Sequence, residues 1–179
     1  MVATARGGWS SIGQVAAGVT TDQAQVRFAD FDGDGKTDYW TIAASGAVQV
    51  WLNRGVNNWS ALGQVATGTT TIRSTVRFAD LDGDTRADYS TIAADGSVQS
   101  YLNRGGDGRG GWLLLGKVAT GLTTTADRVS FSDFTGDGNA DYAMVDPATN
   151  AATVYSWAGG DGHGGWIGLG QVATGVQVG

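Results

Sequence analysis

Apolar and polar residues alternate in short runs along the chain. Val26–Ala29 and Val48–Leu52 place apolar side chains at about every second position, the period of a half-buried β-strand. Tyr39–Ala43 lies between these two runs, and Trp59–Ala66 follows them. Gly, Asn and Asp residues separate the runs, and no segment shows a helical apolar stripe. We therefore predict four strands over this stretch.

The same plan recurs twice further along the chain. Trp9, Trp59, Trp112 and Trp166 each open a copy of Trp-x-x-Leu/Ile-Gly-Gln/Lys-Val-Ala, so the period is 50 to 54 residues. The strands expected in the second and third copies are Val76–Ala79, Tyr89–Ala93, Val98–Leu102 and Trp112–Ala119, then Val129–Ser132, Tyr142–Val145, Thr153–Trp157 and Trp166–Ala173.

Repeated four-stranded units predict an all-β fold, a β-propeller with about three blades per chain. We expect a single repeat domain over 1–179, with full copies at about 9–58, 59–111 and 112–165 and a partial copy at 166–179. Propellers close at about four to eight blades, so three are too few. We expect self-association to complete the ring, with a six-bladed homodimer favoured. The alternative is a fragment of a longer propeller.

Acidic loops follow the first strand of each copy. In the loop from Asp30 to Asp38, four carboxylates and the carbonyl of the seventh residue are spaced to converge on one hard cation. Because four crowded carboxylates repel one another without a cation, we predict structural Ca²⁺, up to one per repeat. The alternative is that Asp and Gly simply form tight turns. The predicted ligands are Asp30, Asp32, Asp34, Lys36, Asp38, Asp80, Asp82, Asp84, Arg86, Asp88, Asp133, Thr135, Asp137, Asn139 and Asp141, with Lys36, Arg86 and Asn139 offering their carbonyl oxygens.

The three loops are chemically unequal. Gly35 occupies the sixth place of the first loop, where a calcium loop turns sharply. Thr85 stands there in the second loop, and a β-branched residue is poorly suited to positive φ. Thr135 replaces the second carboxylate of the third loop. We expect weaker binding in the second and third loops, or a different bend in the second.

Composition limits the function classes. With a net charge of −6 there is no basic patch for nucleic acid, and no apolar run is long enough to cross a membrane. The first residues lack the apolar core of a signal peptide, so localisation stays open, with an extracellular site favoured by the calcium loops. His163 is the lone histidine and there is no cysteine, so the parts of a nucleophilic or zinc mechanism are missing. We expect no enzyme.

The order of these motifs resembles the FG-GAP/VCBS repeat family, and most closely its Psathyrella velutina lectin (PVL) type. The segments that carry the resemblance are Val26–Gly35, the Asp38-Tyr39 pair, Val50–Asn53 and Trp59–Gly68. The resemblance implies a propeller that binds N-acetylglucosamine or sialic-acid-type sugars in shallow pockets between blades. Those lectins have seven blades in one polypeptide, whereas this chain has three copies.

Glycan recognition needs aromatic plates and fixed polar groups in a concave site. An Asn-Arg pair precedes a tryptophan in two copies, and the arginines are suited to a carboxylated sugar. The candidate ligand-binding residues are Asn53, Arg54, Trp59, Asn103, Arg104, Trp112 and Trp166. The alternative interpretation makes the tryptophans inter-blade core. Three functions stay open at this point: a lectin, a self-assembling scaffold without a sugar site, and an accessory repeat domain of a secreted protein.

Overall fold

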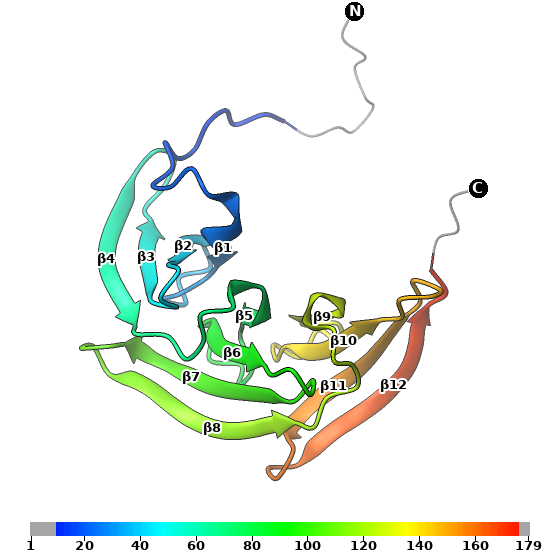
Figure 1. Ribbon diagram of the computed structural model, residues 1–179. Helices are drawn as coiled ribbons and strands as arrows, with labels where there is room; N and C mark the ends of the chain where they lie inside the picture. The colour runs from blue at the N-terminus through cyan, green and yellow to red at the C-terminus, as the bar shows by residue number, and fades with distance from the viewer. Residues whose placement is uncertain (1–9, 176–179) are drawn as a thin grey trace, which may run out of the picture.

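The chain folds into three antiparallel sheets of four strands each, which follow one another around an arc (Figure 1). The computed structural model describes residues 10–175. We call the sheets blade 1 (β1–β4), blade 2 (β5–β8) and blade 3 (β9–β12). The strands are β1 Val26–Ala29, β2 Asp38–Ile42, β3 Val48–Asn53, β4 Trp59–Ala66, β5 Val76–Ala79, β6 Asp88–Ile92, β7 Val98–Gly106, β8 Gly111–Ala119, β9 Val129–Ser132, β10 Asp141–Val145, β11 Ala152–Gly160 and β12 Gly165–Ala173.

Strands pair in chain order within each blade. The first strands β1, β5 and β9 lie on the inner side of the arc, and β4, β8 and β12 lie on its outer side (Figure 1). This confirms the all-β fold with four strands per copy. The blades are shifted relative to copies counted from each tryptophan, because each tryptophan segment is the last strand of a blade. Trp9 lies outside the described residues, and residues 10–22 contain no strand.

Helical structure in the described part of the chain is limited to three short 3-10 turns, one before each blade. These are η1 Gln23–Gln25, η2 Arg73–Thr75 and η3 Ala126–Arg128. None of them has the length or apolar character needed to cross a membrane. Each turn leads directly into the first strand of its blade.

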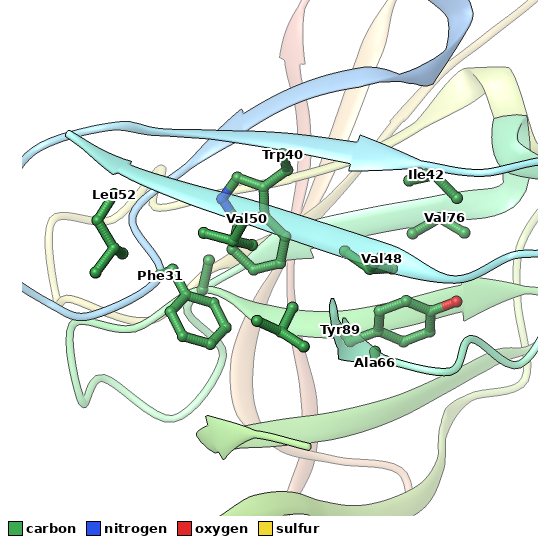
Figure 2. Packing of buried hydrophobic residues seen from close by; sticks show 11 residues of the cluster. Phe31, Trp40, Ile42, Val48, Val50, Leu52, Ala66, Val76 and Tyr89 are labelled. Atoms are coloured by element: carbon green, nitrogen blue, oxygen red, sulfur yellow. The ribbon is translucent and has the colours of Figure 1, made fainter. Parts of the chain in front are cut away.

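Apolar packing between blades forms the core. Trp40, Val48 and Val50 of blade 1 are fully buried in a cluster that also contains Tyr89 of blade 2 (Figure 2). The ring of Phe78 lies 4.2 Å from that of Trp40, across the boundary between the two blades. Since burial of a large apolar side chain contributes about 1.5–3 kcal/mol, these cross-blade contacts hold the arc together.

Backbone hydrogen bonds link the acidic loops of one blade to the next blade. The Ala87 amide donates to the Asp30 carbonyl at 2.7 Å, and the Ala140 amide donates to the Asp80 carbonyl at 2.6 Å. Arg77 adds a third link, because its guanidinium donates to the carbonyls of Ala126 and Val129. The acidic loops therefore lie at the blade boundaries and help to orient neighbouring blades.

Candidate functional site

The acidic loops are built by their first and last carboxylates. Asp30 accepts hydrogen bonds from the amides of Gly33 and Gly35, both at 2.8 Å. Asp38 accepts one from Phe31 inside the loop and another from Asn53 on β3. Because these contacts close the loop and tie it to the sheet, the two carboxylates are fixed before any cation is considered.

Three carboxylates converge in each of the first two loops. Ligand oxygens of Asp30, Asp32 and Asp38 lie within 4.8 Å of one another. The second loop repeats the arrangement with Asp80, Asp82 and Asp88. Within residues 10–175, these are the groups of acidic or histidine side chains close enough to share a metal ion. Six of the carboxylates predicted from the sequence are thus brought together.

One oxygen in each cluster has no partner. Asp32 Oδ1 and Asp82 Oδ1 are buried without a hydrogen bond among the described residues. Buried carboxylate oxygens are rarely left so, and an ion is one of the ordinary explanations. Burial and repulsion from Asp82 and Asp80 raise the pKa of Asp88 to about 7. A hard cation fits both observations, since it would pair the free oxygen and offset the repulsion.

An arginine just after β3, and its equivalent in β7, each contact the second and third carboxylates of an acidic loop. Arg54 donates to Asp32 at 3.0 Å and to Asp34 at 3.2 Å. Arg104 makes the equivalent contacts with Asp82 at 2.7 Å and Asp84 at 2.6 Å. Asp34 and Asp84 therefore face an arginine rather than the three-carboxylate group. Lys36 also pairs with Asp34, and its ammonium lowers the pKa of that carboxyl.

Blade 3 keeps the loop but not the cluster. Asp133 accepts hydrogen bonds from the amides of Gly136 and Gly138, and Asp141 accepts from those of Phe134 and Trp157. Asp137 is used by the loop's own turn. Thr135 adds no carboxylate, and Ala158 stands where the other blades have arginine. The carbonyl contributions of Lys36, Arg86 and Asn139 stay a prediction in all three loops.

The second loop follows the same path as the first. Thr85 has φ 74°, close to the 80° of Gly35. The sequence allowed for a different bend at this place, and the structure shows none. The threonine instead adopts a backbone conformation that a β-branched residue rarely takes, so the loop carries local strain.

Two pockets lie where one blade follows another, and a smaller third pocket lies at the blade 1 end of the arc. Each contains three aromatic positions of one blade, which face the residues after an outer strand in the first two pockets and residues 16–19 in the third. The pocket between blades 2 and 3, with a volume of about 240 Å³, is lined by Ala119, Thr120, Gly121, Leu122, Tyr142, Tyr155, Asp161 and Trp166. The pocket between blades 1 and 2, also about 240 Å³, is lined by Ala66, Thr67, Gly68, Thr69, Tyr89, Tyr101, Asp107 and Trp112. The third, about 160 Å³, is lined by Ala16, Ala17, Gly18, Val19, Tyr39, Trp51 and Trp59.

The tryptophans predicted as ligand plates do line these pockets. Their indole N–H groups also hold the neighbouring segment, because Trp59, Trp112 and Trp166 donate to the carbonyls of Val15, Val65 and Val118. Each is half-buried. Each tryptophan thus both packs against the neighbouring segment and lines a pocket, so the two interpretations made from the sequence are compatible.

The asparagines and arginines lie elsewhere. Asn103 is fully buried, and its amide donates to the carbonyls of Phe31 and Ala87. Asn53 donates to the Thr37 carbonyl and accepts from the Gly55 amide. These contacts give both asparagines a structural role, in contrast to the glycan contact expected from the sequence. The pocket residues that sequence reasoning missed are the tyrosines and Asp107 with Asp161, whose signal was their recurrence in the repeat.

Hydroxyl partners distinguish the two larger pockets. Tyr89 Oη lies 3.4 Å from both the amide nitrogen and Oγ1 of Thr69. Leu122 replaces Thr69 in the next copy, and Tyr142 Oη is buried without a hydrogen-bond partner among the described residues. Burial raises the pKa of Tyr142. The Leu122 amide also lies close enough to act on the Tyr142 hydroxyl, so the two pockets differ in the threonine hydroxyl that only the pocket between blades 1 and 2 supplies.

Comparison with known proteins supports the repeat and the fold. Residues 30–91 match the family model of FG-GAP-like repeats, which confirms that resemblance over this part of the chain. No curated protein matches the sequence. A lectin of Agrocybe aegerita, whose structure is described as the basis of its specific recognition of non-reducing terminal N-acetylglucosamine, is similar with a TM-score of 0.56 and 23% identity over 85% of this chain.

Two further assemblies contain a similar fold. The Photorhabdus luminescens Tc holotoxin pore matches with a TM-score of 0.60 and 20% identity over 87% of this chain. The TcdB2-TccC3-Cdc42 complex matches with 0.53 and 21% over 69%. This chain spans 39% of the lectin chain and 6–7% of the other two chains. At these identities the likeness shows the fold alone.

Proposed function

We propose that the chain is a calcium-stabilised, carbohydrate-binding β-propeller lectin with its glycan sites between blades. The observation that carries the proposal is the pocket repeated at each blade boundary, with aromatic walls and a few polar groups. Such a mixture is typical of sites that hold a small polar ligand with apolar faces. The similar Agrocybe aegerita lectin, described as recognising N-acetylglucosamine, supports the same ligand class. The role is one of binding rather than catalysis.

N-acetylglucosamine suits these pockets better than a sialic-acid-type sugar. Asp161 and Asp107 place a carboxylate in the wall of the two larger pockets, where a carboxylated sugar would be repelled. Arg54 and Arg104, which the sequence suggested as partners for such a carboxylate, are paired with the acidic loops. A neutral sugar avoids the repulsion and can donate its hydroxyl protons to the aspartates.

We assign calcium to the first two loops. Asp30, Asp32 and Asp38 would hold one ion, and Asp80, Asp82 and Asp88 the other. The unpaired oxygens of Asp32 and Asp82 support this assignment. The ion would supply positive charge that holds the carboxylates together; it takes no part in a reaction. The carboxylates stabilise the blades, and the pockets bind the ligand.

We also propose that self-association completes the ring, with two chains giving six blades. Three blades leave an arc with two open ends (Figure 1). Propellers close at about four to eight blades, so two copies would fall within the usual range. Several weak sites in one ring would act together on a multivalent glycan surface.

Calorimetric titration of the full chain with N-acetylglucosamine in excess calcium tests the lectin proposal. We expect binding, and we expect Tyr142→Phe to weaken it, because Tyr142 lines the pocket between blades 2 and 3 and its hydroxyl has no side-chain partner among the described residues. Tyr89→Phe is the matched control, because the Tyr89 hydroxyl already lies beside Thr69. The proposal is overturned if neither the titration nor a glycan array detects binding.

A second candidate is an accessory repeat domain of a larger protein. It is favoured by the two longer chains of which this chain matches only 6–7% of the length. This candidate predicts that tryptophan fluorescence is unchanged by any sugar while the fold and metal content stay intact.

A further inference from the structure

The blade 3 end of the arc exposes a position that is buried at both internal boundaries. Phe31 is 3% exposed and Leu81 is 1% exposed, because each packs against the blade that follows it. Phe134 occupies the same place in the third loop and is 51% exposed. Phe134 thus exposes an apolar surface that the equivalent residues bury against a following blade.

The blade 1 end shows the opposite half of the same contact. Phe78 packs on Trp40 of the preceding blade, whereas Phe28, at the same repeat position, is 63% exposed. Ala87 and Ala140 are each 4% exposed under the preceding acidic loop. Thr37 occupies their place in blade 1 and is exposed. This face is therefore shaped for a preceding blade.

Backbone groups at the two ends are complementary. At each internal boundary an amide donates to the carbonyl of the preceding loop's first aspartate, Ala87 to Asp30 and Ala140 to Asp80. At the ends, the corresponding donor is the Thr37 amide and the corresponding acceptor is the Asp133 carbonyl. Neither makes this contact within residues 10–175. One end offers a donor where the other offers an acceptor.

The asparagines of blades 1 and 2 show a second donor without its acceptor at the blade 1 end. Asn103 bridges two blades, since its amide donates to Ala87 of its own blade and to Phe31 of the preceding one. The side-chain amide of Asn53 donates only within its own blade, to the Thr37 carbonyl. The missing acceptor corresponds to the carbonyl of Phe134.

From this we propose that the blade 3 end of one copy binds the blade 1 end of a second copy, head to tail. The proposal rests on the self-association proposed above and specifies its faces and contacts. Phe134 of one copy would lie against the face formed by Phe28 and Thr37 of the next. Such a contact joins two different surfaces, and it closes into a ring when the rotation between copies fits, so that two copies of three blades share two identical junctions.

This junction lacks an arginine contact that both internal boundaries make. Arg27 and Arg77 reach carbonyls of the following blade, Arg73 in the first case and Ala126 in the second. Blade 3 carries Ser130 at that position, which is too short for the same reach. We therefore expect the junction between copies to be weaker than the contacts between blades of one chain.

Residues 10–19 would be displaced from blade 1 when the ring closes. The Val15 carbonyl accepts from Asn57 and Trp59 as the Val65 carbonyl accepts from Asp107 and Trp112, so this segment holds the place of a preceding outer strand. In a second copy that place would belong to β12. Because β12 is paired with β11 along its length, whereas residues 10–19 are in no strand, the N-terminal segment is the one displaced.

Charge substitutions at each end test the proposal on the full chain. Phe28→Asp and Phe134→Asp should each weaken self-association by about 30-fold or more, the loss expected for a central apolar contact. Leu113→Asp is the matched control, because Leu113 is 52% exposed on the outer strand β8, away from both ends. Native mass spectrometry and sedimentation in calcium, without sugar, report the assembly as a multiple of 18.4 kDa.

Mixing the two variants identifies the geometry. In a head-to-tail ring, the mixture regains one intact junction and forms mixed dimers that neither variant forms alone. A self-complementary contact at one end would be broken by only one of the two substitutions, and that result overturns the proposal. A monomeric unsubstituted chain also overturns it. Sugar titration of the same samples separates these outcomes from the lectin proposal, because the two larger pockets lie within one chain.

Circular dichroism and thermal unfolding show whether the variants keep their fold. Both phenylalanines are largely exposed in the single chain, so the substitutions should leave its unfolding nearly unchanged. Thr37→Trp gives a second, steric block of the blade 1 face and should also reduce assembly. If assembly persists in all three variants, the ends are not the contact surfaces.

Discussion

The acidic loops of blades 2 and 3 have the same backbone framework but different chemistry. Asp80 and Asp88 accept the same kind of backbone hydrogen bonds as Asp133 and Asp141. The second loop adds Asp82 with an unpaired oxygen, and the third has Thr135 instead. The loop therefore folds without a carboxylate at the position of Asp82. That carboxylate is needed for the three-carboxylate group but not for the turn.

An arginine is present in the blades whose acidic loop has the middle carboxylate, Asp32 or Asp82. Arg54 and Arg104 accompany Asp32 and Asp82, while Ala158 accompanies Thr135. An arginine beside a loop with fewer carboxylates would meet less negative charge and gain less from the contact. The comparison thus indicates that the proposed ion and the arginine would share one acidic group, and that the third blade lacks the side chains for both contacts.

Removing calcium should give the largest effect and should distinguish the loops. We expect two bound ions per chain and, at a free calcium concentration about 100 times Kd, a loss of about 2.7 kcal/mol of unfolding free energy per site when EDTA is added. Native mass spectrometry counts the ions, and denaturant unfolding with and without EDTA measures the loss. Three bound ions, or none, would contradict the contrast between blades 2 and 3.

Restoring the missing carboxylate and arginine should give the third loop the ability to bind an ion. Thr135→Asp combined with Ala158→Arg rebuilds the pattern of blade 2, so we expect a third bound ion and a further stabilisation of about 2.7 kcal/mol at 100 times Kd. The converse pair, Asp82→Thr with Arg104→Ala, should reduce the count from two to one. An unchanged ion count in both variants would show that the middle carboxylate does not decide binding.

Relieving the strain at Thr85 should give the smallest effect. Thr85→Gly removes a β-branched side chain from φ 74°, and we expect a gain of about 1 kcal/mol in unfolding free energy. Gly35→Thr places the same strain in the first loop and should shift stability in the opposite direction. Thermal unfolding in EDTA isolates this backbone effect from calcium binding, and a loss on Thr85→Gly would contradict it.

Much of the local structure was predictable from the sequence. The alternating pattern located Val26–Ala29 and Trp59–Ala66 with the bounds that the structure has. The predicted end of the third strand of copy 2 at Leu102 was too early, because β7 continues to Gly106. Gly106 pairs with Gly111 across the hairpin, and both have positive φ, so glycines that looked like a loop extend the two strands.

By itself, the sequence determined the strand period, the number of copies and the acidic loops, because these depend on neighbours within a few residues. Only the tertiary structure decided what the polar groups contact. Asn103 bonds to Phe31 in another blade, Arg104 covers an acidic loop, and the Tyr142 hydroxyl lies beside Leu122, where Tyr89 has a threonine hydroxyl. These partners are brought together by the packing of one blade on the next, which no local pattern specifies.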